Sequence, residues 1–289
     1  MLDAMGSEFT LAPLDGNFGL LARDIDLPVL SDAGLKTLLL ALYENRFVVV
    51  ETGGLEPCDF VAFARRVGEP IRLSGHEEFP EIARITNMGT DTRSTRKGAA
   101  HWHTDQSFRE ELSSVTMLYS VQAPKRGGET RFCDMAGAYR ALPEGRKREI
   151  ADLMVEHRHG VSIAARREDH TPIPPRGWDY RTVYHPLVRS HPVTGAKTLY
   201  AVTGTSQGIR GMEREAAREL LTELGDHAFQ ARFLAAHAHR VHDLLMWDNP
   251  TTMHSASPIG QATGADDTRL IHRISLRGYP PMFGAHVDA

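Results

Sequence analysis

The sequence is poor in cysteine, with only Cys58 and Cys133 among its 289 residues. Two cysteines are too few for a disulfide framework, and neither belongs to a C-x-x-C pair of the kind found in zinc ribbons and thiol redox sites. We therefore expect a protein of a reducing compartment, and the cytoplasm is the predicted location.

The sequence also lacks a long apolar run and an excess of basic residues. A membrane-spanning helix needs about 18 or more consecutive apolar residues, and a signal peptide begins with charged residues followed by apolar ones. Neither pattern occurs. The net charge of −4 and a pI near 6.4 argue against a nucleic-acid surface, which needs clustered basic residues. We expect neither a membrane nor a nucleic-acid partner.

Apolar residues make up 41% of the chain and charged residues 24%, a balance typical of a globular protein with a substantial core. No repeat, low-complexity tract or clear linker divides the chain, and single domains of this length are common. We predict one domain over residues 10–289. Residues 1–9 include Gly-Ser-Glu-Phe, a common remnant of cloning, and are treated as an N-terminal extension.

Short β-branched and alternating runs outnumber the amphipathic segments. They predict a β-rich α+β fold in which helices pack outside a β core. Ser31 is the predicted N-cap of an early helix. A later helix is predicted from Glu213 to Leu224, ended by Gly225. Residues 230–247 are predicted to form a strand pair whose second strand is buried.

Residues 160–182 form the longest stretch without periodicity. A segment of this length inside a compact domain is usually either functional or disordered. We predict that it is a lid over a pocket, with an ordinary surface loop as the alternative.

His103 and Asp105 are two residues apart in the stretch Ala100–Phe108. On an extended strand, residues i and i+2 project to the same face, so an imidazole nitrogen and a carboxylate oxygen would converge. A mononuclear iron site uses two histidines and one carboxylate and leaves its other positions open. His101 and His103 form an equally good pair for a zinc or cupin-type site, and with 15 histidines in the chain such a pattern also arises by chance.

Two later segments add to this pattern. His254 follows a buried strand and a polar turn, which is a good way to carry an imidazole to the open end of a β-barrel. Arg269 and Arg273 share one face of a predicted strand. Two guanidinium groups that point into one cavity imply that anions bind there.

The sequence resembles the taurine and aryloxyalkanoate dioxygenase family of non-haem iron, 2-oxoglutarate-dependent oxygenases. The residues that carry the resemblance are Trp102-His103-Thr104-Asp105, Gly127-Gly128-Glu129-Thr130, the block from His185 to Pro192, Trp247-Asp248-Asn249 with His254, and Arg269 with Arg273. Each block alone is weak, but their order and combination are specific.

The resemblance implies a double-stranded β-helix, or jelly roll, with the metal between its two sheets. It implies that His103, Asp105 and His254 bind Fe(II). The co-substrate 2-oxoglutarate would be held by Arg269, through its distal carboxylate, and by Thr130. With O2, such an enzyme converts 2-oxoglutarate to succinate and CO2 while it oxidises an unactivated C–H bond.

The chain departs from taurine-type members in the loop after Gly68-Glu69 and at Ala99, where those members carry an asparagine. We therefore do not expect taurine as the substrate. The expected substrate is a small organic acid, a carboxylate or a sulfonate, anchored by Arg273 with help from His76 or Asn87. The oligomeric state stays open, and a homo-oligomer is compatible with the sequence.

Two alternative functions are compatible with parts of the same residue pattern. The same cofactors could desaturate, cyclise or rearrange a biosynthetic intermediate. A protein of a different class, such as a zinc-loaded cupin-type isomerase or a silent ligand sensor, could bind a metal without redox turnover.

Overall fold

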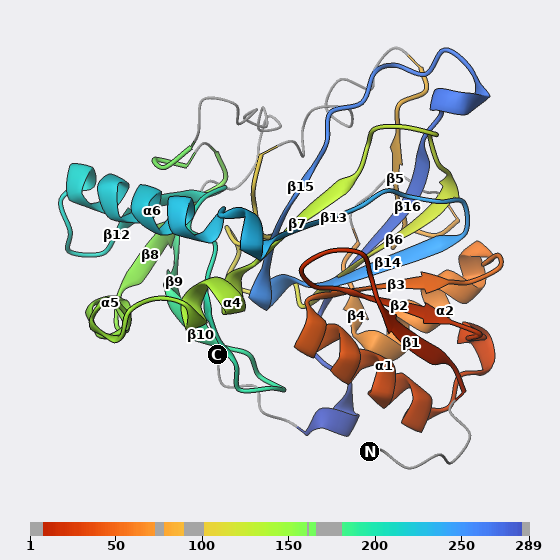
Figure 1. Cartoon of the computed structure of the whole chain (residues 1–289), viewed down its shortest axis with the longest axis horizontal. Helices are drawn as coiled ribbons and strands as arrows, with labels where there is room; N and C mark the ends of the chain where they lie inside the picture. The colour runs from red at the N-terminus through yellow and green to blue at the C-terminus, as the bar shows by residue number, and fades with distance from the viewer. Residues whose placement is uncertain (1–7, 73–77, 90–100, 161, 166–180, 285–289) are drawn as a thin grey trace.

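The computed structural model describes residues 8–72, 78–89, 101–160, 162–165 and 181–284. Its largest unit is an eight-stranded sheet with the order β1-β2-β3-β14-β6-β16-β4, in which β5 lies beside β16 (Figure 1). Among the described strands, β2 and β3 alone pair in parallel. The strands are β1 (Thr10–Pro13), β2 (Leu20–Arg23), β3 (Phe47–Glu51), β4 (Glu69–Pro70), β5 (Ala83–Thr86), β6 (Val115–Gln122), β14 (Asp243–Asp248) and β16 (Leu270–Arg277).

Three smaller antiparallel sheets complete the described β-structure. The one that matters for the site has the order β13-β7-β15 and consists of β13 (Leu234–His237), β7 (Thr130–Asp134) and β15 (Thr252–Ala256). The others are β12-β8-β9, made of β12 (Ser206–Ile209), β8 (Met154–His157) and β9 (Val183–Pro186), and the hairpin of β10 (Val188–Ser190) and β11 (Lys197–Leu199).

Helices cover both outer sides of this β-structure (Figure 1). The described α-helices are α1 (Asp32–Asn45), α2 (Pro57–Val67), α4 (Met135–Arg140), α5 (Glu144–Ile150) and α6 (Arg214–Ala228). The short 3₁₀ turns in the same part of the chain are η1 (Leu27–Val29), η2 (Ala231–Phe233), η3 (Asn249–Thr251), η4 (Ala265–Asp267) and η5 (Pro281–Phe283). Among the described residues, no helix is long and apolar enough to cross a membrane.

Helix α1 shows how local sequence and packing agree. Its N-cap Ser31 accepts a hydrogen bond from the Gly34 backbone N–H at 3.1 Å, which satisfies one of the free donors of the first turn. Leu35, Leu38 and Leu42 then recur on one face and are fully buried against the large sheet. Each such leucine contributes roughly 1.5–3 kcal/mol through the apolar surface it removes from water.

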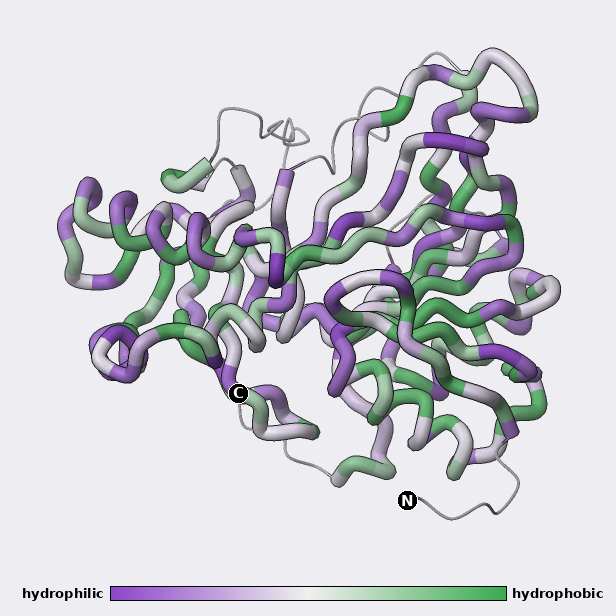
Figure 2. The backbone as a smooth tube through the Cα atoms, viewed as in Figure 1, coloured by the Kyte–Doolittle hydropathy of each residue, from purple (hydrophilic) through white to green (hydrophobic). Residues whose placement is uncertain are grey.

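Period-two alternation separates the two faces of the large sheet. On β14, Leu244 and Met246 belong to the core beneath α1 and α2, whereas Leu245 and Trp247 face the β13-β7-β15 sheet. Across that gap, Phe132 of β7 stacks on Phe47 with ring centroids 4.4 Å apart. In Figure 2 much of the central part of the large sheet has the colour of hydrophobic residues. Apolar side chains fill this part of the space between the two sheets, so a polar group buried there needs a partner.

The structure confirms the β-rich α+β architecture. It corrects the expected strand pair in residues 230–247, because β13 pairs with β7 and β14 pairs with β3 and β6. It also corrects the end of the last helix. Helix α6 continues through Gly225 to Ala228, since burial of Leu221, Leu224 and Ala228 outweighs the cost of a helical glycine, about 1 kcal/mol.

The predicted extension of residues 1–9 ends in two residues that contact the domain. The Glu8 carboxylate accepts a hydrogen bond from the Ser31 backbone N–H at 2.9 Å, and Phe9 is buried in the core beneath α1. The single-domain assignment over 10–289 stays a prediction, as does the lid, because residues 161 and 166–180 lie outside the described part of the chain.

Candidate active site

His103 and His254 are brought together by their backbones. The two residues form an isolated antiparallel bridge, with N–H to carbonyl distances of 3.0 and 2.8 Å, and their rings are 4.3 Å apart between centroids. His254 is the central residue of β15. His103 forms a strand bridge, but the expected strand does not continue, because Asp105 begins a turn in which Gln106 has a φ of +56°. The His103 and Asp105 side chains nevertheless converge, as expected from their i, i+2 spacing.

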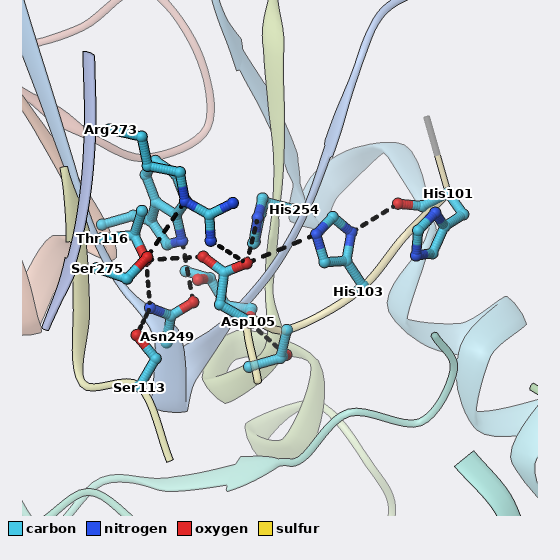
Figure 3. A network of polar contacts seen from close by, with 12 residues as sticks. His101, His103, Asp105, Ser113, Thr116, Asn249, His254, Arg273 and Ser275 are labelled. Atoms are coloured by element: carbon cyan, nitrogen blue, oxygen red, sulfur yellow. Dashed lines mark hydrogen bonds and ion pairs between the residues drawn. The ribbon is translucent and has the colours of Figure 1, made fainter. Parts of the chain in front are cut away.

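The Asp105 carboxylate lies between the two histidines and completes the expected ligand set (Figure 3). Its Oδ1 atom is 3.7 Å from Nε2 of His103 and 3.7 Å from Nε2 of His254. When two ligand atoms each lie roughly 2 Å from the same transition-metal ion, the distance between the two ligand atoms is of this size. All three residues are largely buried, so the donor set fits a metal ion on one side and leaves the rest of its coordination sphere to other ligands.

The protonation of His103 suits metal binding. Its Nδ1 lies 2.9 Å from the His101 carbonyl oxygen, which only accepts, so Nδ1 carries the proton and Nε2 keeps its lone pair. Burial, followed by the neighbouring His254, lowers the pKa of His103 to about 4. Burial also lowers the pKa of His254 to about 4, although Asp105 opposes this. Both imidazoles are therefore neutral near pH 7, as metal ligands must be.

A chain of hydrogen bonds fixes the rotation of the Asp105 carboxylate. The Thr116 hydroxyl donates to Oδ2 at 2.7 Å, and Thr116 in turn accepts from the Asn249 amide at 3.0 Å. The Asn249 carbonyl oxygen is itself held by the Trp247 indole N–H at 3.1 Å. Since Oδ2 is occupied, Oδ1 is the oxygen that faces the histidines. Thr116 was not identified from the sequence, and its polar character near the start of a buried strand was the available signal.

Arg273 lies on the other side of the same carboxylate. Its guanidinium is 2.7 Å from Asp105 Oδ1, and its Nε donates to the Ser275 hydroxyl at 3.2 Å. Burial alone raises the pKa of Asp105, but Arg273 and the two imidazoles outweigh it and hold this pKa well below its usual range. An anion bound by Arg273 would therefore lie directly beside the metal ligands.

Arg269 and Thr130, the expected co-substrate residues, are both buried. Arg269 precedes β16 and is 3% exposed, and Thr130 begins β7 and is 5% exposed. Burial lowers the pKa of Arg269, a cost that an anionic ligand would offset. Gly128 leaves room for this side chain, because a Cβ at Gly128 would lie 3.2 Å from Arg269 Nη1.

Asn87 takes a different position from the one expected of a substrate contact. It is fully buried. Its Oδ1 accepts from the Arg269 backbone N–H at 2.7 Å, and its Nδ2 donates to the Gly260 and Asp267 carbonyl oxygens at 3.0 and 2.8 Å. Asn87 therefore positions the backbone of Arg269, and a direct contact with substrate stays a prediction without structural support. His76, the other expected helper, lies outside the described residues.

His239 is a residue of this region that the sequence did not single out. It follows β13, is 8% exposed and lies between the hydroxyls of Thr130 and Ser120, at 2.9 and 3.0 Å. A surface pocket beside His239 is also lined by Lys125, Arg126, Arg240 and Glu129, and Lys125 pairs with Asp266 at 2.7 Å. The only sequence signal was a histidine two residues after a strand end, in a chain that has 15 histidines.

Comparison with known proteins identifies the chemistry that this site serves. The family model "Taurine catabolism dioxygenase TauD, TfdA family" matches residues 10–275. The chain belongs to this family. The resemblance inferred from the sequence is thus confirmed, and the protein is a non-haem iron, 2-oxoglutarate-dependent dioxygenase whose cofactors are Fe(II), 2-oxoglutarate and O2.

Individual relatives show how widely the family varies. The dioxygenase is 31% identical over 251 residues to an alpha-ketoglutarate-dependent 2,4-dichlorophenoxyacetate dioxygenase from a Burkholderia species, covering 78% of this chain and 80% of the relative. It is 32% identical over 235 residues to pentalenolactone F synthase from Streptomyces arenae, covering 75% and 77%. A crystal structure of a taurine dioxygenase from Burkholderia xenovorans superposes with a TM-score of 0.77 at 25% identity, covering 94% of this chain and 90% of that one.

Family membership decides between two classes of function considered for the sequence. The protein belongs to the class of oxidoreductases that consume 2-oxoglutarate, not to the alternative class of non-redox cupin-type isomerases or sensors. Family membership does not identify the substrate that the dioxygenase oxidises, so the substrate class has to be inferred from the residues of this chain.

Proposed function

We propose that the dioxygenase oxidises a small, anionic organic substrate, a carboxylate or a sulfonate, at an unactivated C–H bond. The observation that carries the proposal is the position of Arg273. Its guanidinium lies 2.7 Å from Asp105 Oδ1, so an anion paired with Arg273 would hold the adjacent carbon chain beside the metal. A guanidinium binds such an anion through two parallel, charge-assisted hydrogen bonds.

The proposal assigns separate tasks to the residues of the site. His103, Asp105 and His254 hold Fe(II), which with 2-oxoglutarate and O2 supplies the oxidation, coupled to release of succinate and CO2. Arg269 binds the distal carboxylate of 2-oxoglutarate and Thr130 donates a hydrogen bond to it. The core that carries these residues is proposed to be a double-stranded β-helix, in which the eight-stranded sheet faces the β13-β7-β15 sheet.

The reaction is proposed to be hydroxylation. Where the hydroxylated carbon carries a heteroatom, the product collapses and the heteroatom group leaves. The relative that acts on 2,4-dichlorophenoxyacetate has a substrate of this kind, an anion with an ether oxygen. Arg273 in this chain is suited to the same class of ligand.

A second candidate is a biosynthetic oxidation such as desaturation, cyclisation or rearrangement. Its support is the 32% identity to pentalenolactone F synthase. Both candidates release succinate, so analysis of the organic product separates them.

Anaerobic titration of Fe(II) and 2-oxoglutarate tests the cofactor roles of the residues. Wild-type protein is expected to develop the weak visible charge-transfer band of the iron chelate, and Asp105→Ala is expected to lose it. Retention of the band in Asp105→Ala would remove Asp105 from the ligand set. Succinate release with a panel of small carboxylates and sulfonates, compared with neutral esters of the same acids, then tests the substrate class. Equal turnover of acids and esters would overturn the anionic substrate.

A further inference from the structure

We propose that His239 is a positioning residue for 2-oxoglutarate, and that it orients the Thr130 hydroxyl so that this hydroxyl donates its hydrogen to the distal carboxylate of the co-substrate. The inference rests on the assignment of Arg269 and Thr130 to that carboxylate in the proposed function.

The imidazole of His239 connects the two facing sheets. Its Nδ1 is 3.0 Å from the hydroxyl of Ser120 on β6, in the large sheet. Its Nε2 is 2.9 Å from the hydroxyl of Thr130 on β7, in the smaller sheet. All three side chains are buried, with exposed fractions of 8% for His239, 0% for Ser120 and 5% for Thr130. The ring is therefore held at both nitrogens, and its orientation is fixed.

The ring is neutral under physiological conditions. Burial, followed by His237 and Arg269, lowers the pKa of His239 to about 3. A neutral imidazole has one N–H donor and one acceptor nitrogen. Only two arrangements of the hydrogens between Ser120, His239 and Thr130 are then available.

In the first arrangement, Nε2 accepts and Thr130 donates its only hydroxyl hydrogen to the ring. Thr130 would then present only lone pairs to the co-substrate, which repel a carboxylate. In the second arrangement, Nε2–H donates to Thr130, Nδ1 accepts from Ser120, and the Thr130 hydrogen is free. Only the second allows Thr130 to donate to a carboxylate that is paired with Arg269.

The second arrangement forms a directed chain from Ser120 to His239, then to Thr130 and then to the co-substrate. Each hydrogen bond in such a chain polarises the next one, so the final donor is stronger than an isolated hydroxyl. The whole charge-assisted bond is expected to be worth about tenfold in affinity, which is the lower range for a hydrogen bond to a charged group.

The test compares two five-carbon acids that differ only at the end facing Arg269. 2-Oxoglutarate has a distal carboxylate, and 2-oxovalerate has a methyl group in its place. Dissociation constants are measured by calorimetry on zinc-loaded, full-length protein, which avoids turnover. The variants are His239→Phe, which removes both nitrogens, and His239→Gln, whose amide N–H can replace Nε2–H.

The proposal expects His239→Phe to weaken 2-oxoglutarate binding about tenfold and to change 2-oxovalerate binding less than twofold. His239→Gln is expected to retain 2-oxoglutarate affinity within about threefold. An equal loss for both acids in His239→Phe would show a general structural role, and no loss for either would show that the ring is not needed. A loss in His239→Gln as large as in His239→Phe would show that the Nε2–H donor is not responsible. Each of these results overturns the proposal.

Nitrogen-15 NMR of the imidazoles gives a direct readout that does not depend on affinity. The zinc and 2-oxoglutarate complex is expected to show His239 protonated at Nε2, with the signal assigned by its loss in His239→Gln. Protonation at Nδ1 overturns the proposal. If wild-type, zinc-loaded protein fails to bind 2-oxoglutarate at all, the assigned roles of Arg269 and Thr130 fail with it. Normal wild-type binding with unaffected His239 variants overturns this inference alone.

Discussion

Gly204 lies directly against His103, so the backbone that follows β11 supports the proposed metal site. A Cβ built on Gly204 would be 3.0 Å from the Cβ of His103 and 3.1 Å from its Cα. Gly204 has a φ of +80°, in the left-handed region where a side chain is also strained. The close approach explains why this position suits glycine even though its neighbours Val202, Thr203 and Thr205 are β-branched.

Gly204→Ala is therefore expected to weaken metal binding about tenfold or more, because the added methyl group displaces His103 from its backbone bridge with His254. Gly211→Ala is the matched control, since Gly211 has a φ of +75° and no atom within 4 Å of a built Cβ. Both variants carry the backbone strain, and only Gly204→Ala carries the contact. Zinc affinity is measured by competition with a chelating dye. Equal affinities in the two variants would show that the contact does not control His103.

The hydroxyl of Thr116 is expected to control metal affinity through Asp105. Thr116→Val keeps the shape of the side chain but removes the donor to Asp105 Oδ2, which lies 2.7 Å away. Loss of a hydrogen bond to a metal-binding carboxylate typically costs 10–100-fold in affinity, and we expect a loss in this range.

Thr116→Ser keeps the hydroxyl and is the control for that loss. It is expected to bind zinc within about threefold of the wild type in the same dye competition. Circular dichroism establishes that both variants are folded. If Thr116→Ser loses as much affinity as Thr116→Val, packing of the methyl group, not the hydrogen bond, supports the site.

Sequence patterns were sufficient to identify the family and to propose the metal ligands, because the residue types themselves report the chemistry. The pair His103 and Asp105, a later histidine after a buried strand and a polar turn, and two arginines four residues apart restrict the fold class and the cofactors together. The apolar run ending in Trp247 and the alternation around Arg273 also placed these two residues on strands, β14 and β16. Each of these signals depends on spacing within one segment of the chain.

The supporting residues could not be predicted because their partners come from other strands. The hydrogen bonds of Thr116 with Asp105, of Ser120 with His239 and of Asn87 with Arg269 connect residues from different segments of the chain. They form only when the strands that carry or flank these residues are in register. The expected pairing of residues 230–247 failed for the same reason, since nothing in β13 or β14 encodes that β7 and β3 are their neighbours. Long-range pairing is a property of the whole sheet, which spacing within one segment does not report.

Buried histidines are expected to make the protein sensitive to mild acid. His157 is fully buried, and burial, followed by His185 and Arg189, lowers its pKa to about 3, whereas an unfolded histidine titrates near 6.5. The unfolded chain therefore takes up a proton first as the pH falls, and stability is lost progressively below about pH 6.5. At pH 5.5 one such histidine lowers the free energy of unfolding by about 1.4 kcal/mol.

His157→Asn removes this titration and keeps a polar atom for the contact with the Thr205 hydroxyl, now 3.0 Å from Nδ1. The free energy of unfolding is measured in urea at pH 7.5 and pH 5.5, in the presence of a chelator so that no metal is bound. The decrease between the two values is expected to be about 1.4 kcal/mol smaller in the variant than in the wild type. Parallel decreases in the two proteins would show that His157 is not responsible.

Arg273→Gln is expected to separate substrate binding from co-substrate binding. The substitution removes the proposed anchor, so the KM of the anionic substrate found by succinate release should rise at least tenfold. The dissociation constant of 2-oxoglutarate should stay within about twofold, because Arg269 is unchanged. Metal affinity should not fall, since the lost positive charge lay 2.7 Å from Asp105 Oδ1 and repels a cation bound there.

Arg277→Gln is the control on the same strand, because Arg277 pairs with Glu69 and Glu111 at the surface and lies away from the metal ligands. Its removal takes away an equal charge and should leave the substrate KM unchanged. A rise of the same size in both variants would point to a general loss of positive potential. In Arg273→Gln, the dissociation constant of 2-oxoglutarate could instead rise as much as the substrate KM. That result would place Arg273 in the co-substrate pocket, and the anionic group of the substrate would then need a different partner.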